Sequence, residues 1–321
     1  KQTVNINKIV LGNKAEDKVI RYIPHGLNSN IYRPLETTED LDEMEKMKLE
    51  LFGKDEIDFI LFFNSRNIRR KSIPDALAAW KMFIDTLSSE EKEKVLFVLH
   101  TDPVSDHGTD LPAVIEYLLG EDDDTVVISN QKLPHQHMNY LYNMADGVIL
   151  ISAAEGWGLA LTESMLTGTP FIANVTGGMQ DQMRFVDDKG NWYTNSKEIP
   201  SNQFGTYKEH GKWALPVYPQ AMGLVGSPVT PYIWDSRCDF RDARDRIIEL
   251  YNMSKEERQE RGNAGREWAT GDEAGFTAAK MGERFIEGVE ELFSTWKPRK
   301  KFTFSSDTDF KPRVLNHKLE Y

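Results

Sequence analysis

The sequence predicts an α/β fold built on a doubly wound parallel sheet, with an aromatic-rich insertion and C-terminal helices. Short apolar runs bounded by turn residues alternate with amphipathic segments along the first half of the chain. The runs are apolar throughout instead of alternating with polar residues, which is typical of strands buried on both faces. The 321 residues, of which 40% are hydrophobic, suffice for one large domain or two smaller ones.

The expected strands and helices alternate along the chain, and this alternation is typical of βαβ units. The helix after the first strand begins at Pro74, a residue that suits the first turn of a helix. We expect strands over 59–64, 95–100, 125–129, 147–152 and 170–174. We expect the helices between and after them over 74–87, 111–119, 135–144 and 159–166.

Residues 186–234 break this alternation. They contain eight aromatic residues and five prolines, with little periodicity. The stretch is too aromatic for a disordered linker and too long for a routine loop, so we expect an ordered insertion. Three helices should follow, over 240–252, 255–269 and 273–296, the second of them opened by a capping box of Ser254 and Glu257.

The composition argues against several classes of protein. A net charge of −12 disfavours a nucleic-acid surface, which needs a basic stripe. No run of 18 apolar residues exists and the first residues are polar, so we expect neither a membrane span nor a secretory signal. The single cysteine, Cys238, excludes an internal disulfide and fits a reducing compartment. We therefore expect a cytoplasmic protein, and contact of the basic run at 297–301 with a membrane surface or a partner stays an alternative to plain solvation.

Cationic side chains follow the first predicted strand, in the segment NSRNIRRK. This segment offers Arg66, Arg69, Arg70 and Lys71, and we expect one of Arg69 and Arg70 to lie on the surface. In an open parallel sheet, ligands bind beyond the carboxyl ends of the strands. Arginine and lysine at that place suit phosphate oxygens.

Two carboxylates flank a glycine turn after the strand at 147–152, in the segment AEGWGLALTE. Gly156 and Gly158 let the backbone approach a ligand, and the N–H groups that open the following helix can bind an anion. Glu163 suits a vicinal diol such as a ribose, and Glu155 could accept hydrogen bonds from sugar hydroxyls. The two segments together predict a site for a nucleoside diphosphate joined to a sugar.

These residues resemble the donor-binding half of a retaining glycosyltransferase of the two-Rossmann-domain type, in particular glycosyltransferase family four. The family carries two glutamates separated by seven residues around a Gly-aromatic-Gly-Leu turn, matched here by Glu155 and Glu163. It also carries an arginine and a lysine five apart, matched by Arg66 and Lys71. The segments 23–34 and 168–181 are similar to its interdomain segment and to its later strand with a glycine pair.

The resemblance implies a role for each matching residue. Arg66 and Lys71 would bind the diphosphate and, with Glu155 on the hydroxyls of the transferred sugar, carry catalysis. Glu163 would hold the ribose. The glycine turn between the two glutamates would help to hold phosphate or sugar, through Gly156, Trp157, Gly158 and Leu159. The resemblance further implies a Rossmann-like domain, transfer that keeps the anomeric configuration, and no metal or other cofactor.

The sequence departs from the family in two respects. Ser65 and Ser72 stand where glycine is usual, beside Arg66 and Lys71. The acceptor-binding domain should precede residue 23, so we expect residues 1–22 to be a linker or remnant of a missing N-terminal domain, or the chain to work with a partner. Residues 23–296, with the insertion at 186–234, would then form the donor-binding domain, and 297–321 a tail.

For four further residues the sequence leaves two structural or functional roles open. Trp192, Tyr207 and Trp213 could form a small satellite core or stack on acceptor sugars, and the core is the stronger expectation. His25 could pack at the hinge between domains or take part in catalysis.

Neither candidate for a metal site is convincing. The acidic loop 121–124 precedes its strand, at the wrong end of the sheet for a ligand, and should be solvated. His135 and His137, two residues apart at a helix start, should face different directions and hold no metal.

The function that follows is transfer of a hexose from a nucleotide sugar to an unknown glycan, lipid or protein acceptor. A nucleotide-sugar epimerase or a glycan phosphorylase of the same fold remains an alternative, although no segment clearly offers the pyridoxal-phosphate lysine of a phosphorylase. A non-catalytic sugar-nucleotide-binding module is the alternative from a different class. The acidic charge makes nucleic acid an unlikely partner in each case.

Overall fold

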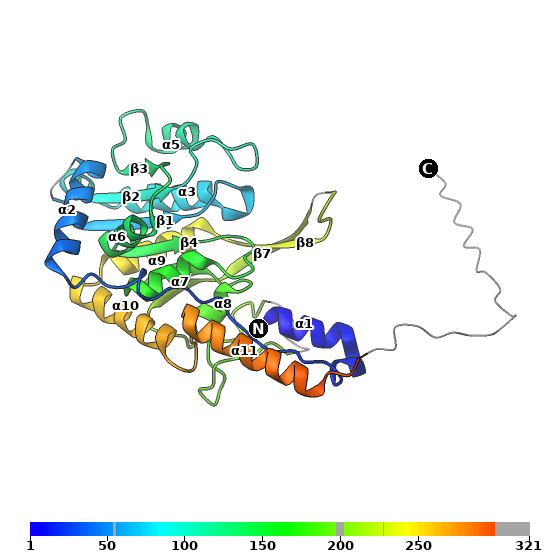
Figure 1. Ribbon diagram of the computed structural model, residues 1–321. Coiled ribbons are helices and arrows are strands. Elements are labelled where there is room, and N and C mark those ends of the chain that lie inside the picture. The colour runs from blue at the N-terminus through cyan, green and yellow to red at the C-terminus, as the bar shows by residue number, and fades with distance from the viewer. Residues whose placement is uncertain (54–55, 197–201, 227, 299–321) are drawn as a thin grey trace, which may run out of the picture.

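The computed structural model describes residues 1–53, 56–196, 202–226 and 228–298. Its centre is a parallel sheet of six strands in the order β3-β2-β1-β4-β5-β6 (Figure 1). The strands are β1 (Phe59–Asn64), β2 (Val95–His100), β3 (Val126–Ser129), β4 (Gly147–Leu150), β5 (Phe171–Asn174) and β6 (Ala214–Val217). The predicted α/β class and the parallel sheet are therefore confirmed.

The strand order reverses between β1 and β4. From β1 the chain moves outward through β2 to β3, and then returns to place β4 on the other side of β1. Crossovers of opposite direction leave a crevice at the carboxyl ends of the two central strands, where ligands bind in folds of this class. Asn64 and the residues after Leu150 stand at that edge.

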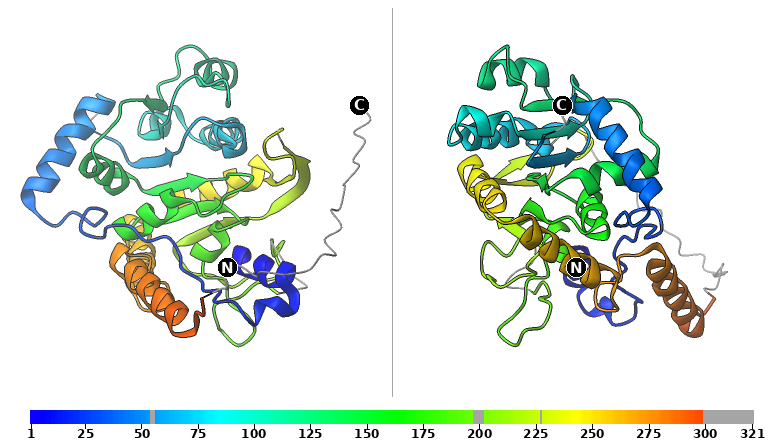
Figure 2. Two further views of the ribbon diagram at one scale, coloured as in Figure 1. Left: turned by 45° about the vertical axis from the view of Figure 1, so that its right-hand side comes forward. Right: turned by 90° about the vertical axis from the view of Figure 1, so that its left-hand side faces the viewer.

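Helices cover both faces of the sheet (Figure 2). On one side α3 (Ile73–Ile84) packs against both α5 (Leu111–Leu119) and α9 (Phe240–Tyr251). On the other side α7 (Leu159–Thr167) packs against α6 (His135–Met144) and α10 (Lys255–Thr270). The strands are apolar on both faces because each face of the sheet is covered by a layer of helices.

Shorter and peripheral elements complete the chain. Before β1 lie α1 (Gln2–Leu11), η1 (Gly12–Ala15) and α2 (Thr38–Phe52). The later ones are η2 (Arg69–Lys71), α4 (Ser89–Lys92), α8 (Met179–Gln182), β7 (Pro219–Val225), β8 (Ile233–Cys238) and α11 (Ala278–Thr295).

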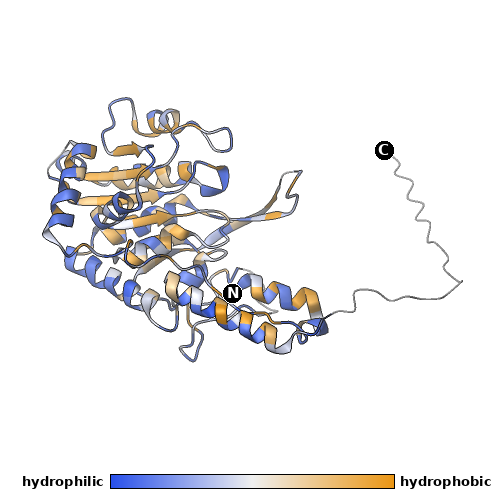
Figure 3. Cartoon of the chain, in the orientation of Figure 1, coloured by the Kyte–Doolittle hydropathy of each residue, from blue (hydrophilic) through white to orange (hydrophobic). Residues whose placement is uncertain are grey.

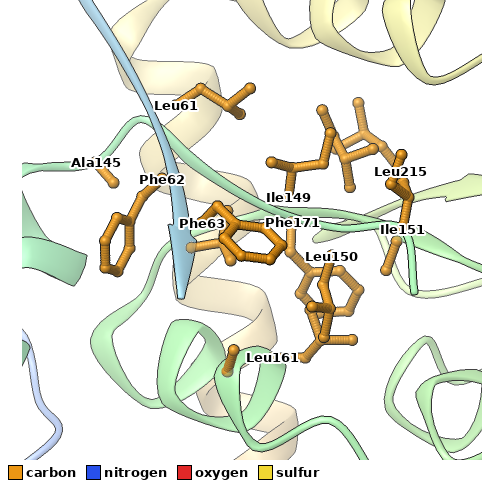
Figure 4. Packing of buried hydrophobic residues seen from close by; sticks show 14 of the residues in the cluster. Leu61, Phe62, Phe63, Ala145, Ile149, Leu150, Ile151, Leu161, Phe171 and Leu215 are labelled. Carbon is orange, nitrogen blue, oxygen red and sulfur yellow. The ribbon is translucent and has the colours of Figure 1, made fainter. Parts of the chain in front are cut away.

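The core lies between the sheet and the two helical layers. Phe62 and Phe63 of β1 point to opposite faces, as successive strand residues must, and both are fully buried (Figure 4). Ile149 and Phe171 continue the packing across β4 and β5. Figure 3 shows the same pattern, with hydrophobic strands inside and mostly hydrophilic helix surfaces outside. A rigid sheet of this kind fixes the residues that follow each strand.

The expected insertion at 186–234 is only partly separate from the sheet. Residues Ala214–Val217 form β6, which pairs in parallel with β5 as the edge strand, so they belong to the main sheet. Pro216 lies within this short strand, and proline is tolerated at an edge, where one row of amide groups has no ladder partner. The segment after β6 forms the antiparallel pair β7 and β8, which extends away from the body (Figure 1).

The helices differ from the expectation at a few places. Helices α1 and α2 were not predicted, and the last helix begins at Ala278 instead of residue 273. Thr277 accepts a hydrogen bond from Lys280 N and so caps α11, while Gly275 has a positive φ of 57° that the helix cannot include. Ser254 caps α10 by accepting a hydrogen bond from Glu257 N, which is one half of the predicted capping box.

The tail expected at 297–321 lies outside the described residues from 299 onward. None of the helices in the described ranges has the length and apolar content that a membrane crossing requires.

Candidate active site

An open cavity of about 640 Å³ lies at the carboxyl edge of the sheet, at the crevice between β1 and β4. Residues that follow β1, β2, β3 and β4 line it, together with the first turn of α7. The cavity brings together most of the predicted site: Arg66, Lys71, Glu155, Trp157, Gly158, Leu159 and Glu163 all line it. The spatial convergence of two segments 84 residues apart is therefore as the sequence predicted.

Lys71 ends the short turn η2, which residues 65–68 connect to the end of β1. Its side chain is buried, whereas Arg66 is exposed at the rim of the cavity. Ser72 next to Lys71 adopts a left-handed conformation, with φ 53° and ψ 38°. Glycine adopts this conformation without strain, so the backbone explains why a glycine would be usual at this position. The turn aims Lys71 into the cavity while Ile73 enters the core.

Glu155 forms ion pairs with two cations. The ammonium group of Lys71 donates a hydrogen bond to its Oε1 atom, and Arg70 Nη1 lies 3.1 Å from its Oε2 atom. Burial alone would raise the pKa of Glu155, but Lys71 and Arg70 outweigh it and lower that pKa. Burial lowers the pKa of Lys71, and Glu155 offsets only part of this effect. The site therefore holds a carboxylate that is ionised at neutral pH.

The backbone around Glu155 is held by the glycine pair 177–178. Gly178 N donates a hydrogen bond of 3.0 Å to the carbonyl oxygen of Glu155. A Cβ atom at Gly177 would lie 2.0 Å from that same oxygen, and Gly177 also has a positive φ of 52°. Any side chain at Gly177 would push Glu155 out of place.

Glu163 projects from α7 and is held by an aromatic hydroxyl. Tyr142, fully buried in α6, donates its hydroxyl hydrogen to Glu163 Oε2, and Asn64 Nδ2 donates to the same oxygen at 3.2 Å. Asn64 Nδ2 also donates to the Tyr142 hydroxyl at 2.9 Å. Burial raises the pKa of Glu163, and these hydrogen bonds offset only part of the effect. The network fixes the direction of the carboxylate on the cavity wall.

The glycine turn that opens α7 differs in part from its prediction. Gly158 has a φ of 88°, precedes the helix and lines the cavity with Leu159. Trp157 reaches the cavity wall, but its ring is buried and its indole N–H donates to Thr162 Oγ1 at 2.9 Å, so it serves mainly as a packing residue. Gly156 lies outside this cavity and lines two neighbouring ones.

Strands β2 and β3 also supply residues to the cavity, and these were not predicted from the sequence. His100 ends β2 and is followed by Thr101 and Asp102, and Ser129 ends β3 and is followed by residues 130–132. His100 Nδ1 lies 3.1 Å from Ser129 Oγ, and burial lowers the pKa of His100 so that the ring is neutral at pH 7. The one sequence feature that could have identified these residues is their position at the carboxyl ends of two predicted strands.

The remaining cationic candidates are placed as follows. Arg69 is exposed and does not line the cavity, whereas Arg70 contacts Glu155 from its far side. His25 is exposed on the cavity rim, with its ring 5.8 Å from that of Trp157. His135 contacts the Tyr32 hydroxyl at 3.2 Å through Nδ1. Within the described ranges no three His, Cys, Asp or Glu side chains gather as metal ligands would.

The aromatic residues of the stretch 186–234 are divided between core and surface. Trp213 is buried and stacks on Trp268, with ring centroids 5.0 Å apart. Trp192 also contacts Trp268, and Tyr207 packs against Tyr193. Trp213 therefore belongs to the main hydrophobic core, and Trp192 and Tyr207 pack against that core while partly buried, so the expected packing role is seen as part of that core instead of a separate satellite core. The acidic residues 121–124 lie between α5 and β3, at the amino end of that strand.

Comparison with known proteins finds a family model that matches part of the chain. Residues 117–197 match the model described as "Glycosyl transferases group 1". This range includes both glutamates, the glycine turn and the glycine pair. No curated protein matches the chain in sequence.

Solved structures resemble most of the chain. Sucrose-phosphate synthase from Thermosynechococcus elongatus is 21% identical with a TM-score of 0.58, and the match covers 86% of this chain and 53% of that one. A glycosyltransferase from Rickettsia africae is 15% identical with a TM-score of 0.62, and covers 90% and 62%. HepE from Anabaena, in complex with UDP and glucose, is 17% identical with a TM-score of 0.56, and covers 83% and 56%.

These matches extend over little more than half the length of each solved relative. At such identities they establish the fold, and the family match adds the segment that carries both glutamates. The chain thus has the α/β fold of these solved proteins, and its residues 117–197 match the family model described as glycosyl transferases group 1.

Proposed function

We propose that the chain binds a nucleoside-diphosphate sugar in the cavity at the β1–β4 crevice and is the donor-binding half of a retaining hexosyltransferase. The observation that carries the proposal is the convergence of Arg66, Lys71, Glu155 and Glu163 on one cavity at the switch point of the sheet. Cations and carboxylates placed together match a ligand that has phosphates at its centre and hydroxyl groups at both ends.

Lys71 and Arg66 would bind the diphosphate. As the bond between sugar and phosphate breaks, negative charge grows on the leaving group, and fixed cations stabilise that charge. The N–H groups of the first turn of α7, next to Gly158, would add hydrogen-bond donors. With this charge compensation supplied by side chains, we propose that transfer needs no metal ion.

The two glutamates would hold the two ends of the donor. Glu163 is oriented by Tyr142 and Asn64, so its carboxylate can accept hydrogen bonds from a ribose diol without losing its direction. Glu155 lies on the opposite side of the glycine turn, where it would accept hydrogen bonds from the hydroxyls of the sugar. Because Glu155 pairs with Lys71, its negative charge would lie close to the negatively charged phosphates, with the positive charge of Lys71 beside both.

Uridine is the first base to test, because the solved HepE structures contain UDP, UDP with glucose, and UDP-glucose. Since the chain spans little more than half of those proteins, transfer would also need a second half or a partner chain for the acceptor.

Isothermal titration calorimetry with UDP, GDP and ADP tests the donor site. We expect one nucleotide to bind, and Lys71→Ala to weaken that binding at least tenfold, about 1.4 kcal/mol. Lys81→Ala is the matched control, because Lys81 lies on α3 and pairs with the carboxylate of Asp85. Absence of binding by all three nucleotides, or equal binding by both variants, would contradict the proposal.

Sugar transfer and its stereochemistry need a separate measurement, made on the chain together with the acceptor-binding half that we propose. NMR of the product should show the same anomeric configuration as the donor, with activity unchanged by a metal chelator. A complex that binds UDP-glucose but neither transfers nor hydrolyses it would instead favour a non-catalytic sugar-nucleotide-binding module.

A further inference from the structure

A second cavity, of about 520 Å³, lies on the far side of Glu155. Its walls come from the β7–β8 pair, from α1 and from the loops after β4 and β5. Of the candidate site residues named from the sequence, Arg70, Glu155 and Gly156 line it. Because it opens beside the proposed donor site, it could hold the molecule that receives the sugar.

Glu155 stands between the two cavities. Lys71, which bonds to Glu155 Oε1, lines the first cavity, and Arg70, 3.1 Å from Glu155 Oε2, lines the second. One carboxylate therefore faces a cation of each cavity with a different oxygen. A ligand in the second cavity would lie next to the group that we assign to the sugar of the donor.

The β7–β8 pair is fixed to the loop that carries Glu155. Ser236 N donates a hydrogen bond of 2.8 Å to Ala153 O, two residues before Glu155. Asn174, at the end of β5, donates through Nδ2 to Ser236 O at 2.6 Å and to Ser152 O at 3.0 Å. Although the hairpin extends away from the body (Figure 1), its base is thus tied to the candidate site.

One face of the hairpin provides an apolar wall. Met222 is paired with Ser236 and Leu224 with Trp234, so these side chains share one face of the two-stranded ladder. Met222 and Trp234 line the cavity, and 56% of the Trp234 surface is exposed. Ile6 of α1 adds to the apolar lining. An exposed indole at a cavity wall is a surface on which a flat apolar face can stack.

Polar groups also line the same cavity. Arg70 is one of them, and Asn202 is another. Asn202 is only 7% exposed, and its Nδ2 group has no hydrogen-bond partner among the described residues. A buried amide N–H group without a partner costs free energy, which a ligand hydroxyl that accepts its hydrogen bond would recover.

We infer that this second cavity is an acceptor subsite that binds the pyranose ring of a carbohydrate acceptor; the inference rests on the proposed function. A pyranose has an apolar C–H face, which suits Trp234, and a rim of hydroxyls, which suits Asn202 and Arg70. A lipid chain would use the apolar wall but leave the Asn202 Nδ2 group without a hydrogen-bond partner. The chain therefore supplies part of the acceptor site from its own donor half, through the hairpin.

Saturation-transfer-difference NMR on the whole chain tests this inference. The probes are the methyl glycosides of glucose, galactose, mannose and N-acetylglucosamine, together with octyl β-D-glucoside below its micelle concentration, each with and without UDP. Trp234→Ala is the test variant. Tyr232→Ala is the matched control, since Tyr232 is 82% exposed on the same hairpin but does not line the cavity.

We expect saturation of the ring protons of at least one glycoside, reduced at least fivefold by Trp234→Ala and unchanged by Tyr232→Ala. Asn202→Ala should reduce it as well. Equal signals from wild type and Trp234→Ala, no glycoside signal at all, or saturation of the octyl chain alone would overturn the inference. Calorimetry with UDP on the same samples reports on the donor site separately, so failure of the donor site and failure of the subsite give different results.

Discussion

The side chains of Lys71 and Glu155, 84 residues apart in the sequence, form an ion pair at the wall of the cavity. Each is largely buried, with 10% of the Lys71 side chain and 6% of the Glu155 side chain exposed. Lys71 is held by the turn after β1 and Glu155 by the loop after β4. The adjacency of those two strands in the sheet is therefore what creates the pair.

Glu155→Gln should tighten the binding of free UDP about fivefold, which corresponds to about 1 kcal/mol. The change removes a negative charge that opposes phosphate beside Lys71, while the amide keeps a hydrogen-bond acceptor. Sugar transfer should fall sharply, and the ligand-free variant should melt at a lower temperature because Lys71 and Arg70 lose their counter-charge. Calorimetry and thermal unfolding measure these effects, with the exposed Glu93→Gln as control. Weaker UDP binding by Glu155→Gln would argue against a phosphate beside Lys71.

Glu163→Gln should stabilise the protein at pH 7 by about 1 kcal/mol, or about 2–4 °C. Burial raises the pKa of Glu163, so the folded state disfavours the ionised form, and stability falls as the pH rises through that pKa. A glutamine accepts the hydrogen bond of Tyr142 without this cost. The gain should disappear below about pH 4.5, where Glu163 is protonated in both states. Melting curves from pH 4 to 8 measure it, and a gain independent of pH would refute the explanation.

The same variant should bind nucleotide about tenfold more weakly, because an amide accepts hydrogen bonds from a diol less well than a carboxylate does. Calorimetry with the nucleotide that binds the wild type measures this loss. Unchanged affinity would place the ribose elsewhere.

Ser72→Gly should raise the free energy of unfolding by about 0.5–1 kcal/mol. Ser72 has a positive φ of 53°, which is strained for serine and relaxed for glycine. Ser72→Ala is the matched control, because it removes the hydroxyl and keeps the strain. Urea unfolding should rank the glycine variant above the wild type and the alanine variant at or below it. A glycine variant no more stable than the alanine variant would show that strain is not the deciding effect.

Gly262→Ala should destabilise the protein by about 2–4 kcal/mol. Gly262 lies in α10, and a Cβ atom there would lie 1.8 Å from the carbonyl oxygen of Gly168 at the end of α7. Gly282→Ala in α11 is the control, since its Cβ would meet no atom within 4 Å, and alanine should stabilise that helix by about 0.5–1 kcal/mol. Urea unfolding of both variants measures the difference. A mild effect at Gly262 would mean that α10 can shift away from α7.

The sheet was predictable from the sequence because its strands are recognisable one by one. The stretch Phe59–Asn64 is apolar throughout and bounded by polar residues, and the structure places it at the centre of the sheet. The strand Ala214–Val217 escaped prediction because it is short and contains Pro216. Its place at the edge of the sheet depends on pairing with β5, which no local pattern reports.

The candidate site was predictable where a motif marked it. Arg66, Lys71, Glu155 and Glu163 stand in recognisable segments, and the fold brings them to one cavity. Trp157 lines the same cavity, while its indole N–H donates a hydrogen bond to Thr162. His100, which the cavity includes, carries no motif, so only the position of β2 identifies it.

The sequence by itself determined the kinds of element and the chemistry that follows each strand, because hydrophobic periodicity and turn residues act over a few neighbours. The tertiary structure alone decided which groups meet. It paired Lys71 with Glu155, set Tyr142 against Glu163, and placed Trp234 beside a cavity while burying Trp213. These outcomes depend on packing between segments far apart in the chain, and such contacts leave no local trace in the order of the residues.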